Sequence, residues 1–239
     1  MTTARPDTID VLVKSITHEA QGINAWELWP VEGILLPAFT AGSHVDLQLR
    51  NGLSRSYSLC NSQDERHRYV VAINNDPASR GGSRHIHETL KAGDTLRISV
   101  PRNNFPLTED ARHTVFIAGG IGITPIWAMI QRLEVLGRPW ELHYSARQRR
   151  ACAFRKRLEV LEQAKPGRVH FNFDQEPGGQ LTDLKALIAS ITPDAHLYCC
   201  GPNSMLRAFE AETAAAQWPS GQVHVEYFTP KAEAAAEGG

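Results

Sequence analysis

Residues 115–125 read Val115-Phe116-Ile117-Ala118-Gly119-Gly120-Ile121-Gly122-Ile123-Thr124-Pro125, a short apolar run followed by a glycine-rich turn. The apolar run predicts a buried strand, and Thr124 and Pro125 predict the capped start of a helix. Glycines alone would line the space before the first helical N–H groups, where the helix dipole is positive. The stretch therefore predicts a phosphate site between a strand and a helix.

The helix predicted after this turn is specified at both ends. Apolar residues recur at three- and four-residue spacing over residues 126–136, and Gly137 follows where a left-handed residue commonly ends a helix. The glycine pattern is G-G-x-G and not the G-x-G-x-x-G dinucleotide fingerprint. Taken alone, the stretch is as compatible with a simple tight turn as with a phosphate site.

Composition narrows the possible functions. The 239 residues leave room for one large domain or two ordinary ones. The net charge of -1 gives no basic excess for binding nucleic acid. The N-terminus has no signal-peptide core and no apolar run could span a bilayer, so we expect a cytoplasmic protein without membrane association. The cysteines, expected as free thiols without a disulfide or zinc pattern, are Cys60, Cys152, Cys199 and Cys200.

The predicted pattern of secondary structure changes near residues 106–113. Short alternating strands separated by turns predict a small antiparallel β-barrel over residues 9–108, with one helix at 84–90. Strands then alternate with helices, which predicts an α/β layer with a parallel sheet. We expect a barrel domain at 1–108, an α/β domain at 109–228 and a linker-like tail at 229–239.

The α/β layer has definite expected elements. Strands are predicted at residues 114–118, 141–145, 169–173, 196–200 and 223–228. Helices are predicted at 125–136, around Phe154, Leu158 and Leu161, at 184–188 after a Thr182 cap, and at 202–217. A ligand of such a sheet binds beyond the carboxyl ends of its strands.

Two segments of the barrel region suggest a second phosphate site. Arg55-Ser56-Tyr57-Ser58 would present a guanidinium and an aromatic ring on one strand face, as a planar phosphorylated ligand requires, although an ordinary exposed strand has the same pattern. Arg80-Gly81-Gly82-Ser83 predicts a glycine turn and a serine cap before the helix at 84–90, or else a flexible turn.

A third segment, Cys199-Cys200-Gly201-Pro202, ends a predicted strand at the ligand edge of the sheet. A thiol there would lie beside a bound ring, whereas most free cysteines are small buried hydrophobic residues. Nothing in the sequence indicates a nucleophile.

Together these four segments resemble the ferredoxin reductase-like flavoproteins, because they occur in the same order and at similar intervals. Within that superfamily, residues 76–83 and 101–107 look most like the phthalate dioxygenase reductase and vanillate demethylase reductase group. The resemblance covers about residues 8–228. Four motifs in register are much more specific than any one of them.

The resemblance implies roles for individual residues. Arg55 would bind the flavin phosphate, Tyr57 would pack on the flavin, and Ser58 would hydrogen-bond near flavin N5. Further flavin contacts are implied at Ser56, Ala72, Asn74, Arg80, Gly81, Gly82, Ser83 and Phe228. Contacts with the nicotinamide cofactor are implied at Gly120, Ile121, Thr124, Cys200, Gly201 and Pro202. Ser58 and Cys200 would lie on either side of the hydride transfer.

The resemblance also guides the choice of cofactors. Members of this group use FMN where most of the superfamily uses FAD, and they generally use NADH. Ser145 and Arg147 follow the second α/β strand, where arginines could receive the 2′-phosphate of NADPH. Asp174 ends the next strand and is a possible acidic partner for the adenosine ribose. We expect FMN and NADH, with FAD and NADPH as the alternatives.

The resemblance implies an NADH-dependent flavin reductase module. Hydride would pass from nicotinamide C4 to flavin N5, and electrons would pass on to an iron–sulfur acceptor serving a terminal oxygenase. Family members usually continue into a 2Fe-2S ferredoxin domain. This chain stops in the linker, so it is either a fragment of a longer protein or a variant that uses a separate ferredoxin.

Two other functions stay open at this point. One is an FAD-dependent ferredoxin or flavodoxin reductase, and the other is a subunit that binds flavin or nucleotide without catalysis. No metal site is predicted. None of the ten histidines is expected to be catalytic, and no glutamate is, because hydride transfer itself needs no acid or base.

Overall fold

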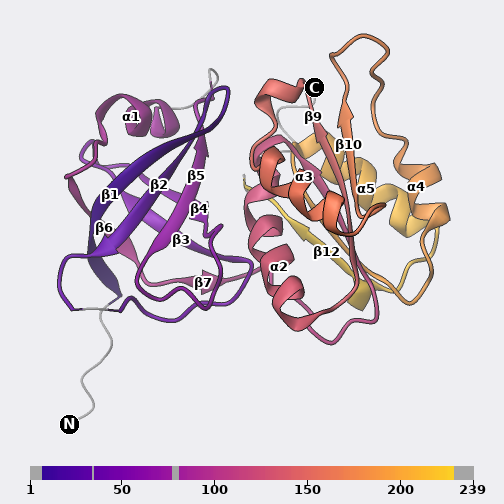
Figure 1. The fold of residues 1–239 in the computed structure, drawn as a ribbon, viewed down its shortest axis with the longest axis horizontal. Helices are drawn as coiled ribbons and strands as arrows, with labels where there is room; N and C mark the ends of the chain where they lie inside the picture. Colours follow the sequence, from indigo (N-terminus) through magenta and orange to yellow (C-terminus); the bar gives the residue numbers. More distant parts are fainter. Residues whose placement is uncertain (1–6, 34, 77–80, 229–239) are drawn as a thin grey trace.

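The chain forms two β-sheets that lie side by side, the first with helix α1 and the second with helices α2 to α5 (Figure 1). The computed structural model describes residues 7–33, 35–76 and 81–228. An antiparallel sheet comes from residues 8–103 and a parallel sheet from residues 114–226. The predicted order, an antiparallel domain followed by an α/β domain, is therefore confirmed.

The antiparallel sheet is barrel-like, with a single isolated bridge between its edges. Its seven strands in the described residues are β1 (Thr8–Ala20), β2 (Ile23–Pro30), β3 (Ser43–Gln48), β4 (Ser54–Ser58), β5 (Tyr69–Asn74), β6 (Thr95–Ser99) and β7 (Arg102–Asn103). They run in the order β4-β3-β6-β1-β2-β5, with β7 paired to β3. Leu59 and Val71 form the bridge that joins the two ends of this order. Helix α1 (Gly82–Thr89) adds its buried Ile86 to the core inside the sheet.

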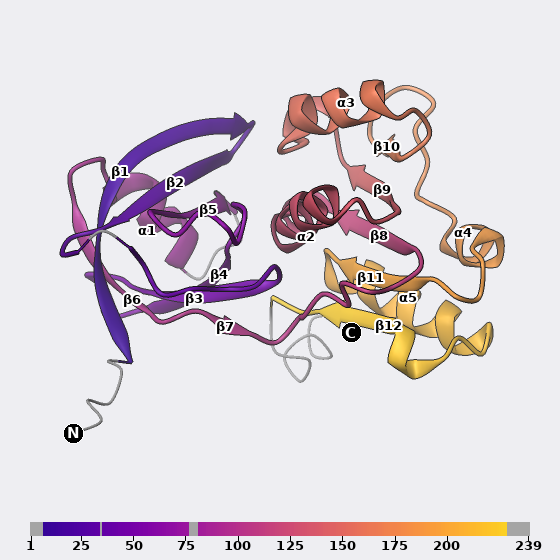
Figure 2. The same ribbon diagram turned by 60° about the horizontal axis from the view of Figure 1, so that its bottom comes forward.

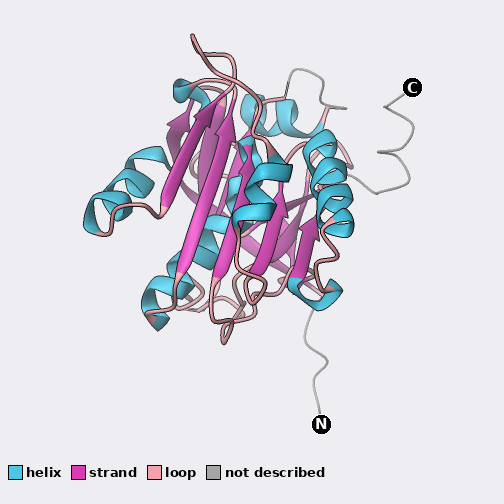
Figure 3. Cartoon of the chain, turned by 90° about the vertical axis from the view of Figure 1, so that its right-hand side faces the viewer, coloured by secondary structure: helices cyan, strands magenta, loops and turns pink. Residues whose placement is uncertain are grey.

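The parallel sheet has helices on both faces (Figures 2 and 3). Within the described residues its strands are β8 (Thr114–Gly119), β9 (Trp140–Ala146), β10 (Val169–Phe173), β11 (His196–Cys200) and β12 (Val223–Glu226), in the order β10-β9-β8-β11-β12. One face packs against α2 (Ile123–Leu136) and α3 (Arg155–Ala164), and the other against α4 (Leu184–Ser190) and α5 (Asn203–Ala215). Three short 3-10 turns are η1 (Gly120–Gly122), η2 (Arg149–Ala151) and η3 (Ser220–Gln222).

An apolar core joins the two domains. Buried residues of the first domain, among them Ala72 and Phe105, belong to the same cluster as Met129 and the rest of the inner face of α2. Figure 2 shows α2 on the side of the parallel sheet nearest the barrel-like domain. The Gln131 side chain also donates a 2.9 Å hydrogen bond to the carbonyl of Cys60. The seam between the domains is therefore packed, and it fixes the ligand edge of the parallel sheet relative to β5.

The predicted helix caps at Thr124 and Thr182 are wrong. The Thr124 hydroxyl lies inside α2 and donates to the Ile121 carbonyl at 3.0 Å, because η1 already leads the chain into a helix that begins at Ile123. Helix α4 is capped by Asp183, whose carboxylate accepts from the Ala186 N–H at 2.9 Å. Thr182 is not the cap, since its hydroxyl is hydrogen-bonded to Ser145.

Other boundaries shift by a few residues. Phe154 precedes α3 in a left-handed conformation, with φ 57°, and α3 begins at Arg155. Gly81 occupies the position before α1 and no side-chain cap is formed there, so the predicted Ser83 cap is also wrong. The predicted left-handed Gly137 is confirmed, with φ 64°. In the described part of the chain, no helix has the length and apolar character needed to cross a membrane.

Candidate functional site

The first candidate anion site lies where Arg55 of β4 contacts Gly82 at the start of α1. A Cβ atom on Gly82 would lie 2.6 Å from Nε of Arg55, so the glycine makes room for the arginine side chain. The guanidinium is held by a 2.8 Å hydrogen bond from Nη1 to the Ser54 carbonyl. The described first turn of α1 carries no acidic residue, and its N–H groups form the positive end of the helix. A guanidinium beside a helix start is suited to a phosphate group.

The remaining residues of the Arg55 strand have different environments. Tyr57 is half-buried against the core of the barrel-like sheet, and burial raises the pKa of its hydroxyl to about 12. Ser58 is buried. The exposed Ser56 donates a 2.5 Å hydrogen bond to the Asp46 carboxylate. Of the predicted neighbours in the glycine turn, Gly81 and Ser83 lie at the start of α1, and Arg80 lies outside the described residues.

The second candidate site lies where the paired strands β8 and β11 end side by side. A Cβ atom on Gly122 would lie 2.1 Å from the carbonyl oxygen of Cys200, and one on Gly119 would lie 2.6 Å from Cδ of Pro202. The two predicted segments, 119–125 and 199–202, are therefore in direct backbone contact. Only glycine can occupy these positions without moving the neighbouring chain.

Tyr144 of β9 supports the glycine turn through hydrogen bonds of its hydroxyl group. Its hydroxyl donates to the Gly120 carbonyl at 3.0 Å and accepts from the Ala153 N–H at 3.1 Å. Gly120 has φ 53°, a left-handed conformation that favours glycine. The Tyr144 ring is fully buried, so this support is rigid. Sequence reasoning missed Tyr144, although its place at the end of β9, facing the glycine turn, is a usable signal.

Elements of the two domains meet beside the glycine turn. Strand β5, which carries Ala72 and Asn74, lies against η1 of the glycine turn. Ala72 is buried in the core shared by the two domains. Two sites in different domains, with their neighbouring elements in contact, can present two ligands to each other.

Cys200 lies beside a carboxyl that the sequence did not single out. Burial, and next the charge of Glu226, raise the pKa of the Cys200 thiol well above its usual value, so the thiol stays protonated and is not a nucleophile. Glu226 pairs with Cys200 in register across β11 and β12. Burial raises the pKa of Glu226 to about 7, and its Oε2 has no hydrogen-bond partner among the described residues. Two residues further on, the Phe228 side chain is 48% exposed.

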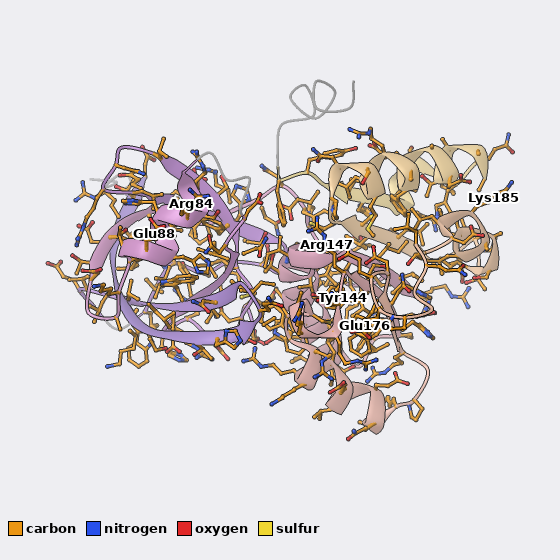
Figure 4. The ribbon with its side chains drawn as sticks, turned by 90° about the horizontal axis from the view of Figure 1, so that it is seen from above. Arg84, Glu88, Tyr144, Arg147, Glu176 and Lys185 are labelled. Atoms are coloured by element: carbon orange, nitrogen blue, oxygen red, sulfur yellow. The ribbon has the colours of Figure 1, made fainter. Side chains whose placement is uncertain are left out.

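The far end of the ligand edge carries the predicted adenosine contacts. Asp174 follows β10, and its buried Oδ1 has no hydrogen-bond partner in the described part of the chain. Ser145 is hydrogen-bonded to Thr182 at 2.8 Å, and Arg147 is exposed. Figure 4 shows Arg147, Tyr144 and Glu176 together in the α/β domain, whereas the labelled residues Arg84 and Glu88 lie on α1 and Lys185 on α4.

The fold and its relatives define a ferredoxin reductase-like flavoprotein oxidoreductase that uses NAD(H). Residues 116–211 match the oxidoreductase NAD-binding domain family. The chain is 50% identical over 221 residues to tetrachlorobenzoquinone reductase of Sphingobium chlorophenolicum, covering 92% of this chain and 68% of the relative. It is 44% identical over 220 residues to vanillate O-demethylase oxidoreductase of Pseudomonas putida, covering 92% and 68%.

A solved structure agrees with these relatives. Phthalate dioxygenase reductase superposes with a TM-score of 0.84 at 34% identity, over 92% of this chain and 67% of that one. The chain therefore belongs to the ferredoxin reductase-like family, in the group of phthalate dioxygenase reductase and vanillate demethylase reductase, as the sequence motifs predicted. The relatives include reductase components of oxygenase systems, which supports electron transfer from NAD(H).

Proposed function

We propose that this chain is an NADH-dependent FMN reductase that passes electrons to an iron–sulfur acceptor of an oxygenase system. The observation that carries the proposal is the Arg55 guanidinium packed on Gly82 at the start of α1, in a domain whose β5 lies against the glycine turn of the other. This arrangement supports one retained phosphorylated ligand and one exchanging ligand that meet at the seam.

The barrel-like domain would hold the flavin. Arg55 and the first N–H groups of α1 would bind its terminal phosphate, and Tyr57 and Ser58 would border its ring. Ala72 and Asn74 of β5 would contact the edge of the ring on the side toward η1. Bound flavin supplies the chemistry that the side chains lack, because it accepts a hydride and gives up electrons singly. FMN is preferred over FAD because of the group to which the chain belongs.

The glycine turn would hold the nicotinamide cofactor. Backbone around Gly120 and Ile121, and the Gly201-Pro202 segment beside it, would orient the nicotinamide ring, and the protonated Cys200 thiol would help to keep water away from it. These contacts contribute to the reaction by orienting the two rings. No proton transfer is assigned to Cys200.

NADH is proposed over NADPH because of the charges at the end of β10. The unpartnered Oδ1 of Asp174 can accept a hydrogen bond from a ribose hydroxyl and would repel a 2′-phosphate. Arg149 already lies 3.7 Å from Glu176 and over the ring of Phe173, so its guanidinium is partly neutralised. Replacing Asp174 with Asn should narrow the ratio of kcat/KM for NADH to that for NADPH.

The direct test is the spectrum of the purified chain before and after anaerobic NADH. We expect FMN to be released on denaturation and the bound flavin to be bleached faster by NADH than by NADPH. Release of FAD would replace FMN and favour the ferredoxin or flavodoxin reductase alternative. A flavin that NADH does not bleach would contradict the proposal and favour a non-catalytic subunit.

The acceptor needs a separate test. Addition of a 2Fe-2S ferredoxin from an oxygenase system to the NADH-reduced chain should restore the oxidised flavin spectrum and bleach the cluster. An unchanged cluster spectrum would contradict the iron–sulfur acceptor without affecting the flavin assignment. The domain limits at residues 108 and 228 and the cytoplasmic location stay predictions.

A further inference from the structure

A cluster of two histidines and a glutamate lies on the parallel sheet away from the ligand edge. Glu141 Oε1 is 2.7 Å from Nε2 of His143 and 3.1 Å from Nε2 of His170. One donor atom from each of the three residues lies within 4.8 Å of the other two. The two imidazole rings are stacked, with centroids 4.6 Å apart.

The register of the sheet produces this cluster. Glu141 and His143 are two residues apart on β9 and therefore share a face. His170 of β10 pairs directly with His143. Alternate residues of β9, such as Leu142, point to the opposite face and pack in the core with α2 and α3.

The cluster is accessible to a small ion from solvent. The exposed fractions of the side chains are 18% for His143, 30% for Glu141 and 46% for His170. The helices on this face, α4 and α5, share their core with β8, β11 and β12. The three donor groups therefore combine partial burial with a route of entry.

We propose that Glu141, His143 and His170 bind a divalent transition-metal ion, with zinc as the best match. Imidazole nitrogen and carboxylate oxygen are common zinc ligands, at about 2.0–2.2 Å from the metal. Three protein ligands leave at least one position for water. The Nε2 atom of His113, 3.8 Å from the second carboxylate oxygen of Glu141, lies near enough to bind such a water or to complete the site.

The donor atoms of the cluster converge on one point. Both Nε2 atoms face one carboxylate oxygen, and a cation at their centre would satisfy all three groups at once. The hydrogen-bonded arrangement is the alternative outcome of the test.

The position of the site indicates a stabilising role. Glu141 and His170 are each the second residue of their strand, so they lie near the amino ends of β9 and β10. Cys200 and Asp174 mark the carboxyl ends, where the pyridine nucleotide is proposed to bind. A metal here would link the edge strand β10 to β9 and leave flavin reduction unchanged.

The test uses the flavin-loaded chain without a histidine tag, stripped of metal with a chelator. Calorimetric titration with zinc should give one ion per chain, and cobalt should give a visible absorption band. Glu141→Gln and His170→Ala should each weaken zinc binding by about 100-fold or more, since even outer contacts of metal sites are worth about 10–100-fold.

A matched control is available in the same sheet. His196 and His224 are also stacked, with ring nitrogens 3.0 Å apart, but they form a pair without a third ligand in the described residues. His196→Gln should leave zinc binding unchanged. Equal zinc affinity in Glu141→Gln and wild type, or no binding by wild type at millimolar zinc, would overturn the proposal.

A thermal readout separates this site from the redox site. At a zinc concentration of about 100 times Kd, the Tm of the wild type should rise by roughly 5 °C, and that of His170→Ala should not. The exposed His170 can be replaced with little risk to folding, which circular dichroism would verify. The rate of flavin bleaching by NADH should be the same with and without zinc, so the proposed function and this site can fail independently.

Discussion

The two glycine turns of this protein look alike in sequence and make room for different groups. In the barrel-like domain, the missing side chain of Gly82 makes room for the guanidinium of Arg55. In the α/β domain, the missing side chain of Gly122 makes room for the carbonyl of Cys200. The first turn thus brings a charged side chain to a helix start, whereas the second brings two backbone segments together.

This difference matches the ligands proposed for the two domains. A hydrogen bond that involves a charged group is roughly twice as strong as a neutral one, so the Arg55 site is suited to a phosphate that stays bound. A turn that offers backbone N–H groups and a helix dipole provides a weaker attraction. Such a site is suited to a cofactor that must leave after each reaction.

The largest effect is expected from Gly122→Ala. Its Cβ would lie 2.1 Å from a backbone oxygen that cannot move without separating β8 from β11. We expect a loss of about 3 kcal/mol or more in the free energy of unfolding, measured by urea denaturation. The control is Gly221→Ala, where a Cβ would meet no atom within 4 Å. Equal stability of the two variants would contradict the conclusion that Gly122 is needed for the backbone contact with Cys200.

A change of similar size but opposite sign is expected from Glu226→Gln, which should stabilise the protein above pH 7. This carboxyl lies beside the second turn, paired in register with Cys200. Burial raises its pKa from 4.5 to about 7, so the folded state binds a proton more tightly than the unfolded state. The free energy of unfolding should therefore fall as the pH rises from 4.5 to 7 and stay low above that. The variant should be more stable than wild type by roughly 3 kcal/mol at pH 8 and about equal at pH 4.5.

Urea denaturation at several pH values would measure this difference. Glu88→Gln, at an exposed position on α1, should reproduce the pH dependence of the wild type. If the stability of Glu226→Gln varied with pH as that of wild type does, the pKa of Glu226 would not be raised on folding.

Most of the fold could be predicted from the sequence because it depends on local patterns. Strand alternation, helical spacing and the Gly137 stop are properties of neighbouring residues, and they gave both domains in the right order. The caps at Thr124 and Thr182 were wrong because hydroxyl groups have several possible partners. Ile121 and Ser145 compete for these two hydroxyls, and only the tertiary structure decides between the partners.

The sequence points to candidate site residues where glycine or arginine motifs occur, and not where burial gives a residue its properties. The unpartnered Oε2 of Glu226 and the support of Gly120 by Tyr144 arise from strand pairing and packing. The cluster of Glu141, His143 and His170 depends on the register between β9 and β10. The spacing in the sequence gives no sign of that register.

A smaller effect, on flavin binding alone, is expected at the first turn. Arg55→Ala should raise the Kd for FMN by about 10–100-fold, since a charge-assisted hydrogen bond contributes about 1.5–3 kcal/mol. Gly82→Ala should weaken binding similarly, because its Cβ would displace the Arg55 side chain. The double variant should be little worse than either single one, as both changes remove the same contact.

Fluorescence titration of the flavin-free chain would measure these three affinities. Arg50→Ala is the control, because this exposed arginine pairs with Asp94 at 3.2 Å. Strictly additive effects of Arg55→Ala and Gly82→Ala would mean that the two residues act on separate parts of the flavin. Gly82 would then not act by placing the Arg55 guanidinium at the start of α1, and the contrast between the two turns would need revision.

The smallest effect, on the rate of flavin reduction, is expected from Cys200→Ala, and Cys199→Ala provides the control. Cys200 packs in the core shared with α2, whereas Cys199 points to the opposite face and packs with α5. Both alanine variants should lose about 1 kcal/mol or somewhat more of stability, because each removes a buried sulfur. Only Cys200→Ala should slow anaerobic flavin bleaching by NADH, by about tenfold, through a looser nicotinamide site. Equal stopped-flow rates for both variants would remove Cys200 from the site and leave the second turn dependent on backbone groups alone.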